Sequence, residues 1–205
     1  SQNVIEAAIG ACVPAVIGIS SDKAVAPLNL YGMSKGFLEK LFTGSSVYSS
    51  RTKFACVRYG NVIGSNGSVV KVFQEQYKHG KFTVTNPDAT RFWITMPEAV
   101  EFVLASIEMM HGGEIFVPKL KAASVKTIYE AISRYTEIDV VGLRSGEKMH
   151  EVLLTEEEME RTEDIEDRYI VRNEKAPAKL PIVTYSSKSV EQLSIAEVRH
   201  LIACL

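Results

Sequence analysis

The stretch AVIGISSDKAVAPLNLYGMSK, residues 15–35, decides the fold of this chain. It opens with the apolar run AVIGIS at 15–20, which has the length and composition of a buried parallel strand. Pro27 then marks a loop, and a helix is expected from about Leu30 to Phe42. A strand that passes through a loop into a helix is the repeating unit of an α/β fold, so we expect a parallel sheet with helices on its faces.

The same alternation of strands and helices continues on both sides of this stretch. FACVRY at 54–59 is expected to be the next strand, and Thr95, Pro97 and Glu98 together mark a helix start. Further strands are expected at 82–85, 114–117 and 138–141, further helices at 1–12, 68–79 and 124–135, and helix caps at Thr155–Glu158 and Ser194–Glu197. Because the later part is mixed and richer in loops, the sequence predicts the C-terminal part of a doubly wound sheet with a small mixed α/β lid.

Composition limits the classes of function. The 205 residues are 46% apolar and 23% charged with a net charge of −2, which is an ordinary globular balance and argues against nucleic-acid binding. No apolar run reaches the ~20 residues of a membrane helix. Cys12, Cys56 and Cys204 lie in apolar segments and are expected to be buried free thiols in a reducing cytoplasm. No Cys/His cluster has metal-ligand spacing, so no metal site is expected, and the acidic segment 156–167 is expected to be a solvated surface.

Five polar residues gather at the end of the first strand and the start of the following helix. Open α/β sheets bind ligands at the carboxyl ends of their strands, where Ser21, Asp22 and Lys23 lie. Tyr31 and Lys35 are four residues apart, so a helix places them on one face. An ammonium favours the ionised form of a nearby phenol, which can take a proton from a sugar hydroxyl while hydride leaves the same carbon. Such pairs also occur by chance on helices and in surface turns, but the position after this strand favours catalysis.

Longer motifs narrow this hypothesis. Ser21, Tyr31 and Lys35 resemble the Ser/Thr-Tyr-Lys set of the short-chain dehydrogenases, and ISSDKAVAPLNLYGMSK at 19–35 is similar to the inverting UDP-N-acetylglucosamine 4,6-dehydratases of polysaccharide biosynthesis. Four more stretches carry the same resemblance: VRYGNVIGSNGSVV at 57–70, TRFWIT at 90–95, GEIFVPK at 113–119 and VGLRSGEKMHEV at 141–152. The resemblance covers nearly the whole chain and implies the Rossmann-like α/β fold of the extended short-chain dehydrogenase/reductase class.

The resemblance implies a reaction on UDP-N-acetylglucosamine that leads towards pseudaminic acid and related bacterial surface sugars. C4 of the sugar is oxidised, water leaves across C5 and C6, and C6 is then reduced. The resemblance implies that Tyr31 is the base at the C4 hydroxyl and that Ser21 forms a hydrogen bond to the C4 oxygen. It implies that Lys35 contacts the nicotinamide ribose. It also implies that Asp22 donates a proton to the departing C6 hydroxyl and that Lys23 is the base at C5.

The resemblance also implies NADP as cofactor, with NAD as the alternative. The residues expected to contact it are Tyr31, Lys35, Tyr59 and Asn61. The UDP part is expected to contact Asn61, Ser68, Val69, Arg91, Arg144 and Glu147. Guanidinium groups suit the diphosphate, a helix start suits an anion, and a carboxylate can accept from ribose hydroxyls. Each arginine could instead form a surface salt bridge, while His150 and Trp93 are expected to be structural.

The expected domains are 1–66, the C-terminal half of an NADP-binding Rossmann domain, and 67–205, mainly a nucleotide-sugar-binding lid with segments that return to the sheet. The Gly-rich phosphate loop of a dinucleotide fold is absent, so the sequence predicts an N-terminal truncation of roughly a hundred residues. We therefore expect the chain alone to be inactive. The full-length protein is expected to be a cytoplasmic homo-oligomer that binds neither nucleic acid nor membrane.

Two other functions stay open at this point. A nucleotide-sugar 4-epimerase would share Tyr31, Lys35 and the cofactor, but it does not need the Asp22–Lys23 pair. A non-catalytic nucleotide-binding module is the second alternative, because the glycine-rich half is missing. Tight NADP binding by this chain alone would count against the second alternative.

Overall fold

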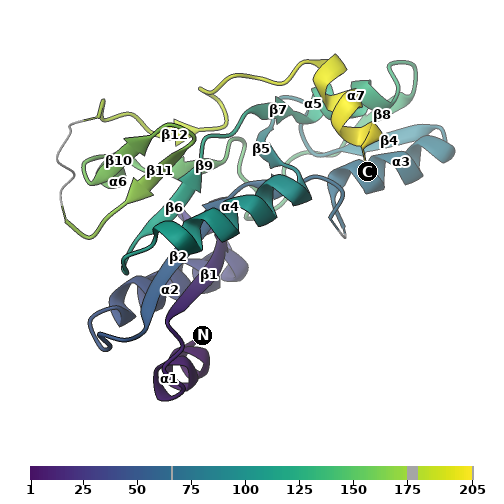
Figure 1. Cartoon of the computed structure of the whole chain (residues 1–205). Coiled ribbons are helices and arrows are strands. Elements are labelled where there is room, and N and C mark those ends of the chain that lie inside the picture. Colours follow the sequence, from purple (N-terminus) through teal and green to yellow (C-terminus); the bar gives the residue numbers. More distant parts are fainter. Residues whose placement is uncertain (66, 175–179, 205) are drawn as a thin grey trace. The chain divides into compact units, whose positions relative to one another are not determined.

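The structure is a computed structural model, and it describes residues 1–65, 67–174 and 180–204. The chain forms two compact units (Figure 1). Unit 1 consists of Ser1–Tyr59, Val100–Lys119 and Val152–Tyr185, and unit 2 consists of Gly60–Ala99, Leu120–Glu151 and Ser186–Leu205. The division expected from the sequence, 1–66 and 67–205, stays a prediction about the domains of the whole protein.

Unit 1 is built on a five-stranded sheet in the order β1-β2-β6-β11-β10. Its strands are β1 (Ala15–Ser21), β2 (Lys53–Tyr59), β6 (Ile115–Pro118), β11 (Arg168–Val171) and β10 (Thr162–Ile165). The first three run parallel to one another, and β11 and β10 are added antiparallel. The strands that the sequence predicts at 15–20, 54–59 and 114–117 are therefore confirmed, as is the expected parallel sheet.

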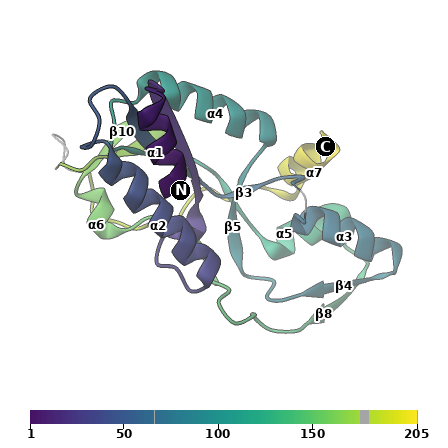
Figure 2. The same cartoon turned by 90° about the horizontal axis from the view of Figure 1, so that it is seen from below.

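Helices cover both faces of this sheet. Unit 1 contains α1 (Gln2–Gly10), the short 3₁₀ helix η1 (Asp22–Ala24), α2 (Leu30–Ser45), most of α4 (Met96–Met109) and α6 (Glu156–Met159). Successive side chains of β2 point to opposite faces. Phe54 meets Phe42 of α2 edge to face, with ring centroids 5.9 Å apart, whereas Val57 packs with Phe102 of α4. It follows that α2 lies on one face of the sheet and α4 on the other (Figure 2).

Unit 2 combines small sheets with helices that share one core. Its elements include β3 (Asn61–Val62), α3 (Val69–Lys78), β4 (Lys81–Val84), β5 (Thr90–Ile94), β7 (Ala122–Ser124), α5 (Val125–Ile132), β8 (Glu137–Val140) and α7 (Ile195–Ala203). One sheet has the order β3-β5-β7, and β4 pairs with β8. Elsewhere in the chain, β9 (Val152–Leu154) of unit 1 pairs with β12 (Tyr185–Ser186). The rings of Phe73, Phe82 and Tyr129 meet at centroid distances of 5.4, 5.9 and 6.3 Å. Through these rings α3 packs against β4 and α5. Figures 1 and 2 show the three elements.

The helix caps predicted from the sequence are present. The Glu98 N–H donates to Thr95 Oγ1 at 3.3 Å, and the Thr95 N–H donates to Glu98 Oε2 at 2.8 Å. The same reciprocal pair of hydrogen bonds caps the N-terminus of α6 at Thr155–Glu158 and of α7 at Ser194–Glu197. These boxes form from residues three apart, which is why the sequence alone suffices to find them.

Two expectations about exposure are wrong. Cys12 and Cys204 are exposed because each follows the end of a helix, and only Cys56, inside β2, is buried. Burial raises the pKa of the Cys56 thiol above its ordinary value. Within the acidic segment 156–167, the Glu158 side chain is only 12% exposed, because it forms an ion pair with Arg58.

Candidate functional site

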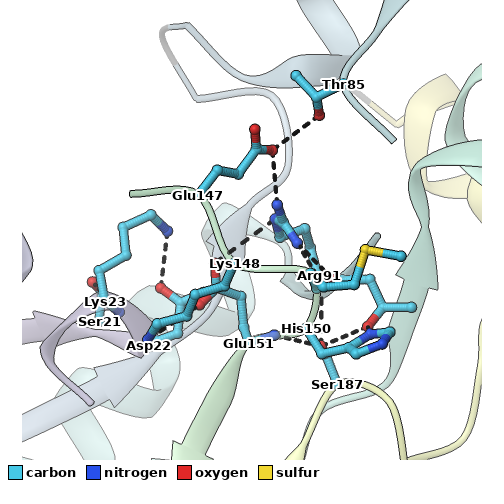
Figure 3. Close-up of polar contacts among 12 residues, drawn as sticks. Ser21, Asp22, Lys23, Thr85, Arg91, Glu147, Lys148, His150, Glu151 and Ser187 are labelled. Carbon is cyan, nitrogen blue, oxygen red and sulfur yellow. Dashed lines mark hydrogen bonds and ion pairs between the residues drawn. The ribbon is translucent and has the colours of Figure 1, made fainter. Parts of the chain in front are cut away.

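The carboxyl end of β1 carries an ion pair between neighbouring residues. Ser21 caps η1 by accepting a hydrogen bond from the Lys23 N–H at 3.2 Å. Lys23 Nζ lies 2.9 Å from Asp22 Oδ1 (Figure 3). The Asp22 side chain is 0% exposed, and its Oδ2 has no hydrogen-bond partner among the described residues. A fully buried carboxylate with one unoccupied oxygen is costly as an anion, so the Lys23 ammonium is its main compensation.

The start of α2 lies against this end of β1. Asn29 caps the helix by accepting from the Gly32 N–H at 2.9 Å. Lys35 Nζ donates to the Ile19 carbonyl at 2.9 Å and lies 5.8 Å from the centre of the Tyr31 ring. The expected Tyr31–Lys35 pair on one helix face is therefore present, and its lysine is anchored to the strand.

A glycine permits the close approach of this helix. A Cβ atom added to Gly32 would lie 2.3 Å from the Lys23 carbonyl oxygen, a distance that real side chains do not reach. Gly32 is thus required at this position if α2 is to begin directly beside the Asp22–Lys23 pair.

Tyr59 belongs to the same group of residues. It pairs with Ser21 in the parallel register of β1 and β2. Burial, and after it the nearby charge of Tyr31, raises the pKa of the Tyr59 phenol. Unit 1 thus brings together the expected residues Ser21, Asp22, Lys23, Tyr31, Lys35 and Tyr59.

Unit 2 contains a pocket of about 280 Å³. Its lining residues are Asn61, Gly67, Val69, Val72, Phe73, Gln76, Thr83, Val84, Thr85, Arg91, Trp93, Val125, Arg144 and Glu147. Five of the expected substrate-binding residues are among them, namely Asn61, Val69, Arg91, Arg144 and Glu147. Ser68 is not, and its Oγ is buried without a hydrogen-bond partner in the described part of the chain. Trp93 is 5% exposed and belongs to the core as well as to the pocket wall.

Glu147 is held by three donors. Its Oε1 accepts from Thr85 Oγ1 and from Arg91 Nη2, both at 3.0 Å (Figure 3). Its Oε2 accepts from the Arg144 N–H at 3.2 Å. The carboxylate therefore fixes the turn at 144–147 against β5 and against the residue that follows β4.

The two arginines of the pocket differ in what they already bind. The Arg91 side chain is 10% exposed, and besides Glu147 it donates to the carbonyls of Thr90 and Met149 at 2.8 and 3.2 Å. Arg144 is exposed, and its guanidinium makes no hydrogen bond or ion pair with another described residue. Arg144 is thus the arginine with N–H donors to offer an anion, whereas Arg91 orients Glu147.

A hydroxyl–imidazole cluster braces the segment after this turn. Thr90 Oγ1 lies 2.8 Å from His150 Nδ1 and 2.7 Å from Ser187 Oγ (Figure 3). Burial, followed by the charges of Lys188 and Arg91, lowers the pKa of His150. His150 does not line the pocket, and these contacts fit the structural role expected for it.

Sequence reasoning missed Gln76, Thr83 and Thr85, which also line the pocket. The signal for Gln76 was the helical spacing from Val69. Thr83 lies in β4 and Thr85 directly follows it, and no repeat in the sequence links either threonine to α3. In the described part of the chain, no group of three His, Cys, Asp or Glu side chains is placed to hold a metal ion. No helix of that part is both long enough and apolar enough to cross a bilayer.

Comparisons with known proteins show the family of the chain. A family model described as "Polysaccharide biosynthesis protein" matches residues 1–173. The inverting UDP-N-acetylglucosamine 4,6-dehydratase of Campylobacter jejuni is 38% identical over 175 residues, which cover 83% of this chain and 52% of that protein. The UDP-glucose 4-epimerase of Rickettsia massiliae is 36% identical over 100% of this chain and 66% of that protein. The chain therefore spans about half the length of the first curated relatives it matches.

Solved structures show the same fold. The X-ray structure of Pen from Bacillus thuringiensis superposes with a TM-score of 0.90 at 35% identity, covering 99% of this chain and 65% of that one. The dTDP-glucose 4,6-dehydratase DesIV of Streptomyces venezuelae has a TM-score of 0.64 at 14% identity over 72% of this chain and 53% of that one, which shows the fold alone. The chain belongs to the polysaccharide biosynthesis protein family, with the Rossmann-like α/β fold of the extended short-chain dehydrogenase/reductase dehydratases and epimerases.

Proposed function

We propose that the complete enzyme, meaning this chain together with the Gly-rich cofactor-binding half expected from the sequence, removes water from UDP-N-acetylglucosamine. The product is a UDP-4-keto-6-deoxy-hexosamine with inversion at C5, used for bacterial surface glycans or flagellin sugars. One observation carries the proposal: the buried Asp22 carboxylate is paired with the partly exposed Lys23 ammonium at the end of β1, in the same unit as Tyr31 and Lys35.

The tyrosine and lysine of α2 suit the oxidation of C4. Tyr31 takes the proton of the C4 hydroxyl, and Ser21 donates a hydrogen bond to the C4 oxygen. The residues also fit a nicotinamide ribose, because a lysine ammonium has three N–H donors and the Ile19 carbonyl takes one of them from Lys35. The cofactor, NADP with NAD as the alternative, supplies a reversible hydride acceptor when it is bound.

The Asp22–Lys23 pair suits the loss of water. Moving one proton from Lys23 Nζ to Asp22 Oδ1, across 2.9 Å, turns the ion pair into a neutral amine and a carboxylic acid. The amine then takes the C5 proton, which the C4 ketone has made acidic, and the acid protonates the departing C6 hydroxyl. After this step Lys23 is again an ammonium and Asp22 is again a carboxylate, so the ion pair is restored.

The pocket of unit 2 suits the nucleotide part of the substrate. The exposed guanidinium of Arg144 is proposed to bind the diphosphate together with Asn61 and the start of α3 at Val69. Glu147 is proposed to accept hydrogen bonds from the ribose hydroxyls. The three hydrogen bonds that its carboxylate already accepts fix the orientation of this carboxylate. The homo-oligomeric state, the cytoplasmic location and the inactivity of this chain alone stay predictions.

A nucleotide-sugar 4-epimerase is the second candidate, supported by the Rickettsia relative that matches the whole chain. The two reactions differ in their product. The complete enzyme with UDP-N-acetylglucosamine and NADP is expected to give a 4-keto-6-deoxy sugar nucleotide in the proton NMR spectrum, with a C6 methyl signal. Formation of a C4 epimer that retains its C6 hydroxyl would show that the enzyme is an epimerase and not a dehydratase.

A further inference from the structure

One face of α3 forms a wall of the pocket in unit 2. Val69, Val72, Phe73 and Gln76 all line the pocket, and their spacing of i, i+3, i+4 and i+7 puts them on one side of the helix. The first three are apolar and the fourth is an amide. Thr83 of β4 lines the same pocket.

The backbone of β4 fixes the orientation of the Gln76 amide. The Thr83 N–H donates to Gln76 Oε1 at 2.9 Å. Because a backbone N–H can only donate, the atom that faces it must be the carbonyl oxygen of the amide. Nε2 is therefore directed away from Thr83, and it makes no hydrogen bond with another described residue. The Nε2 group of Gln76 can therefore donate hydrogen bonds to a ligand in the pocket.

The position of Gln76 along α3 matches the far end of a nucleotide. Gln76 lies seven residues after Val69, which is about 10 Å of helix at 1.5 Å per residue. The start of α3 is the end of the helix that favours an anion, and Arg144 lines the same pocket. A nucleotide with its phosphates at that end would extend its base along the apolar face, with the edge remote from the ribose towards Gln76.

We propose that Gln76 selects the base of the bound nucleotide by donating a hydrogen bond from Nε2 to a carbonyl at C4 of a pyrimidine. Uracil and thymine carry this carbonyl, whereas cytosine carries an amino group that is itself a donor. Two donors that face each other leave both without a partner, which is unfavourable in a half-buried pocket. The inference rests on the proposed function, since it takes a pyrimidine nucleoside diphosphate as the ligand.

Calorimetric titration of the 205-residue chain with UDP and with CDP tests this inference. The wild-type chain is expected to bind UDP about tenfold or more tightly than CDP. Gln76→Glu keeps an oxygen for the Thr83 N–H but replaces the donor by an acceptor, so the ratio of the two affinities should fall by about tenfold or more. Gln76→Met removes the donor without adding a charge and should bring the two affinities together.

Gln74→Glu is the matched control. Gln74 is exposed on the same helix and does not line the pocket, so this variant adds the same charge and should keep the wild-type ratio. A wild-type chain that binds CDP as tightly as UDP, or a Gln76→Glu variant with the wild-type ratio, overturns the inference and leaves the proposed function standing. A wild-type chain that binds no nucleoside diphosphate contradicts the nucleotide site proposed for unit 2, and the inference with it.

Discussion

Glu39 of α2 and Arg58 of β2 are joined by two parallel hydrogen bonds, from Nε to Oε1 at 2.8 Å and from Nη2 to Oε2 at 2.7 Å. Glu158 accepts two more bonds from the same guanidinium, and the Leu153 carbonyl accepts the fifth. All five N–H donors of a buried arginine are thereby used. Because Glu39 lies one turn after Lys35, this cluster fixes the helix that carries the tyrosine–lysine pair.

Replacing the arginine should destabilise the protein strongly. Arg58→Met leaves two buried carboxylates without their cation, and removing one partner of a buried ion pair costs about 3–5 kcal/mol of unfolding free energy. Urea unfolding of the chain measures this loss, with Arg51→Met, an exposed arginine of the same unit, as the control. A loss below about 1 kcal/mol, the value typical of an exposed pair, would show that the cluster is not a closed buried network.

Acid should weaken the same cluster. Burial raises the pKa of Glu158, but its hydrogen bonds and ion pair with Arg58 outweigh burial and lower the pKa below 4.5. A carboxyl group with a lowered folded-state pKa stabilises the fold above pH 4.5, and this contribution is lost as the pH falls through the folded-state pKa. The difference in unfolding free energy between wild type and Glu158→Gln should therefore shrink on acidification. A difference that stays constant with pH would contradict the assignment.

The exposed arginine of the pocket should contribute to nucleotide affinity. Arg144→Ala removes a charge-assisted contact worth about 1.5–3 kcal/mol, so the chain should bind UDP about tenfold or more weakly. The melting temperature should not change, because the Arg144 guanidinium makes no hydrogen bond or ion pair with another described residue. Arg134→Ala, an exposed arginine outside the pocket, should bind UDP as the wild type does. An unchanged affinity of Arg144→Ala for UDP would show that other residues bind the diphosphate.

The phenol of Tyr31 should matter for turnover and not for binding. Tyr31→Phe removes the base at the C4 hydroxyl, and general-base assistance is worth about 10²–10⁴-fold. In the complete enzyme, kcat should fall by this factor while the affinity for UDP is kept. Tyr48→Phe, in which an exposed tyrosine loses its hydroxyl, is the control. A fall in kcat below threefold, with chemistry rate-limiting, would remove Tyr31 from the mechanism.

The sequence predicts the segment from β1 to β2 well because its signals are local. An apolar run, a proline and a helical repeat each act over a few residues, and Tyr31 and Lys35 are placed by one turn of helix. The contacts that complete the sites act over far longer separations. Arg58 and Glu158 are 100 residues apart, and Thr85 and Glu147 are 62 apart. No periodic pattern links such residues, so the acidic segment 156–167 was wrongly expected to be solvated throughout.

In the pocket, too, some residues could be found from the sequence and others only from the structure. Motif resemblance singled out Arg144 and Glu147, and the structure adds that Glu147 is already engaged by Arg91 and Thr85. Gln76 was missed because Gln74, Glu75 and Gln76 together look like the solvated face of α3. Its role becomes visible only once Thr83 is seen to hold its carbonyl oxygen.

Lys23 separates a dehydratase from an epimerase, because only the dehydratase breaks the C5–H bond. In the complete enzyme, Lys23→Ala should stop the loss of water and leave reversible oxidation at C4 intact, seen as transient absorbance of the reduced cofactor. Lys40→Ala, an exposed lysine on α2, is the matched control and should behave as the wild type does.

The most direct measurement is incorporation of solvent deuterium at C5 during turnover of UDP-N-acetylglucosamine in D₂O. Wild-type enzyme is expected to place deuterium at C5 of a 4-keto-6-deoxy product, and Lys23→Ala is expected to place none. Exchange at the wild-type rate in Lys23→Ala would show that Lys23 is not the base. A wild-type enzyme that interconverts the C4 epimers and leaves C5 undeuterated would contradict the dehydratase assignment itself.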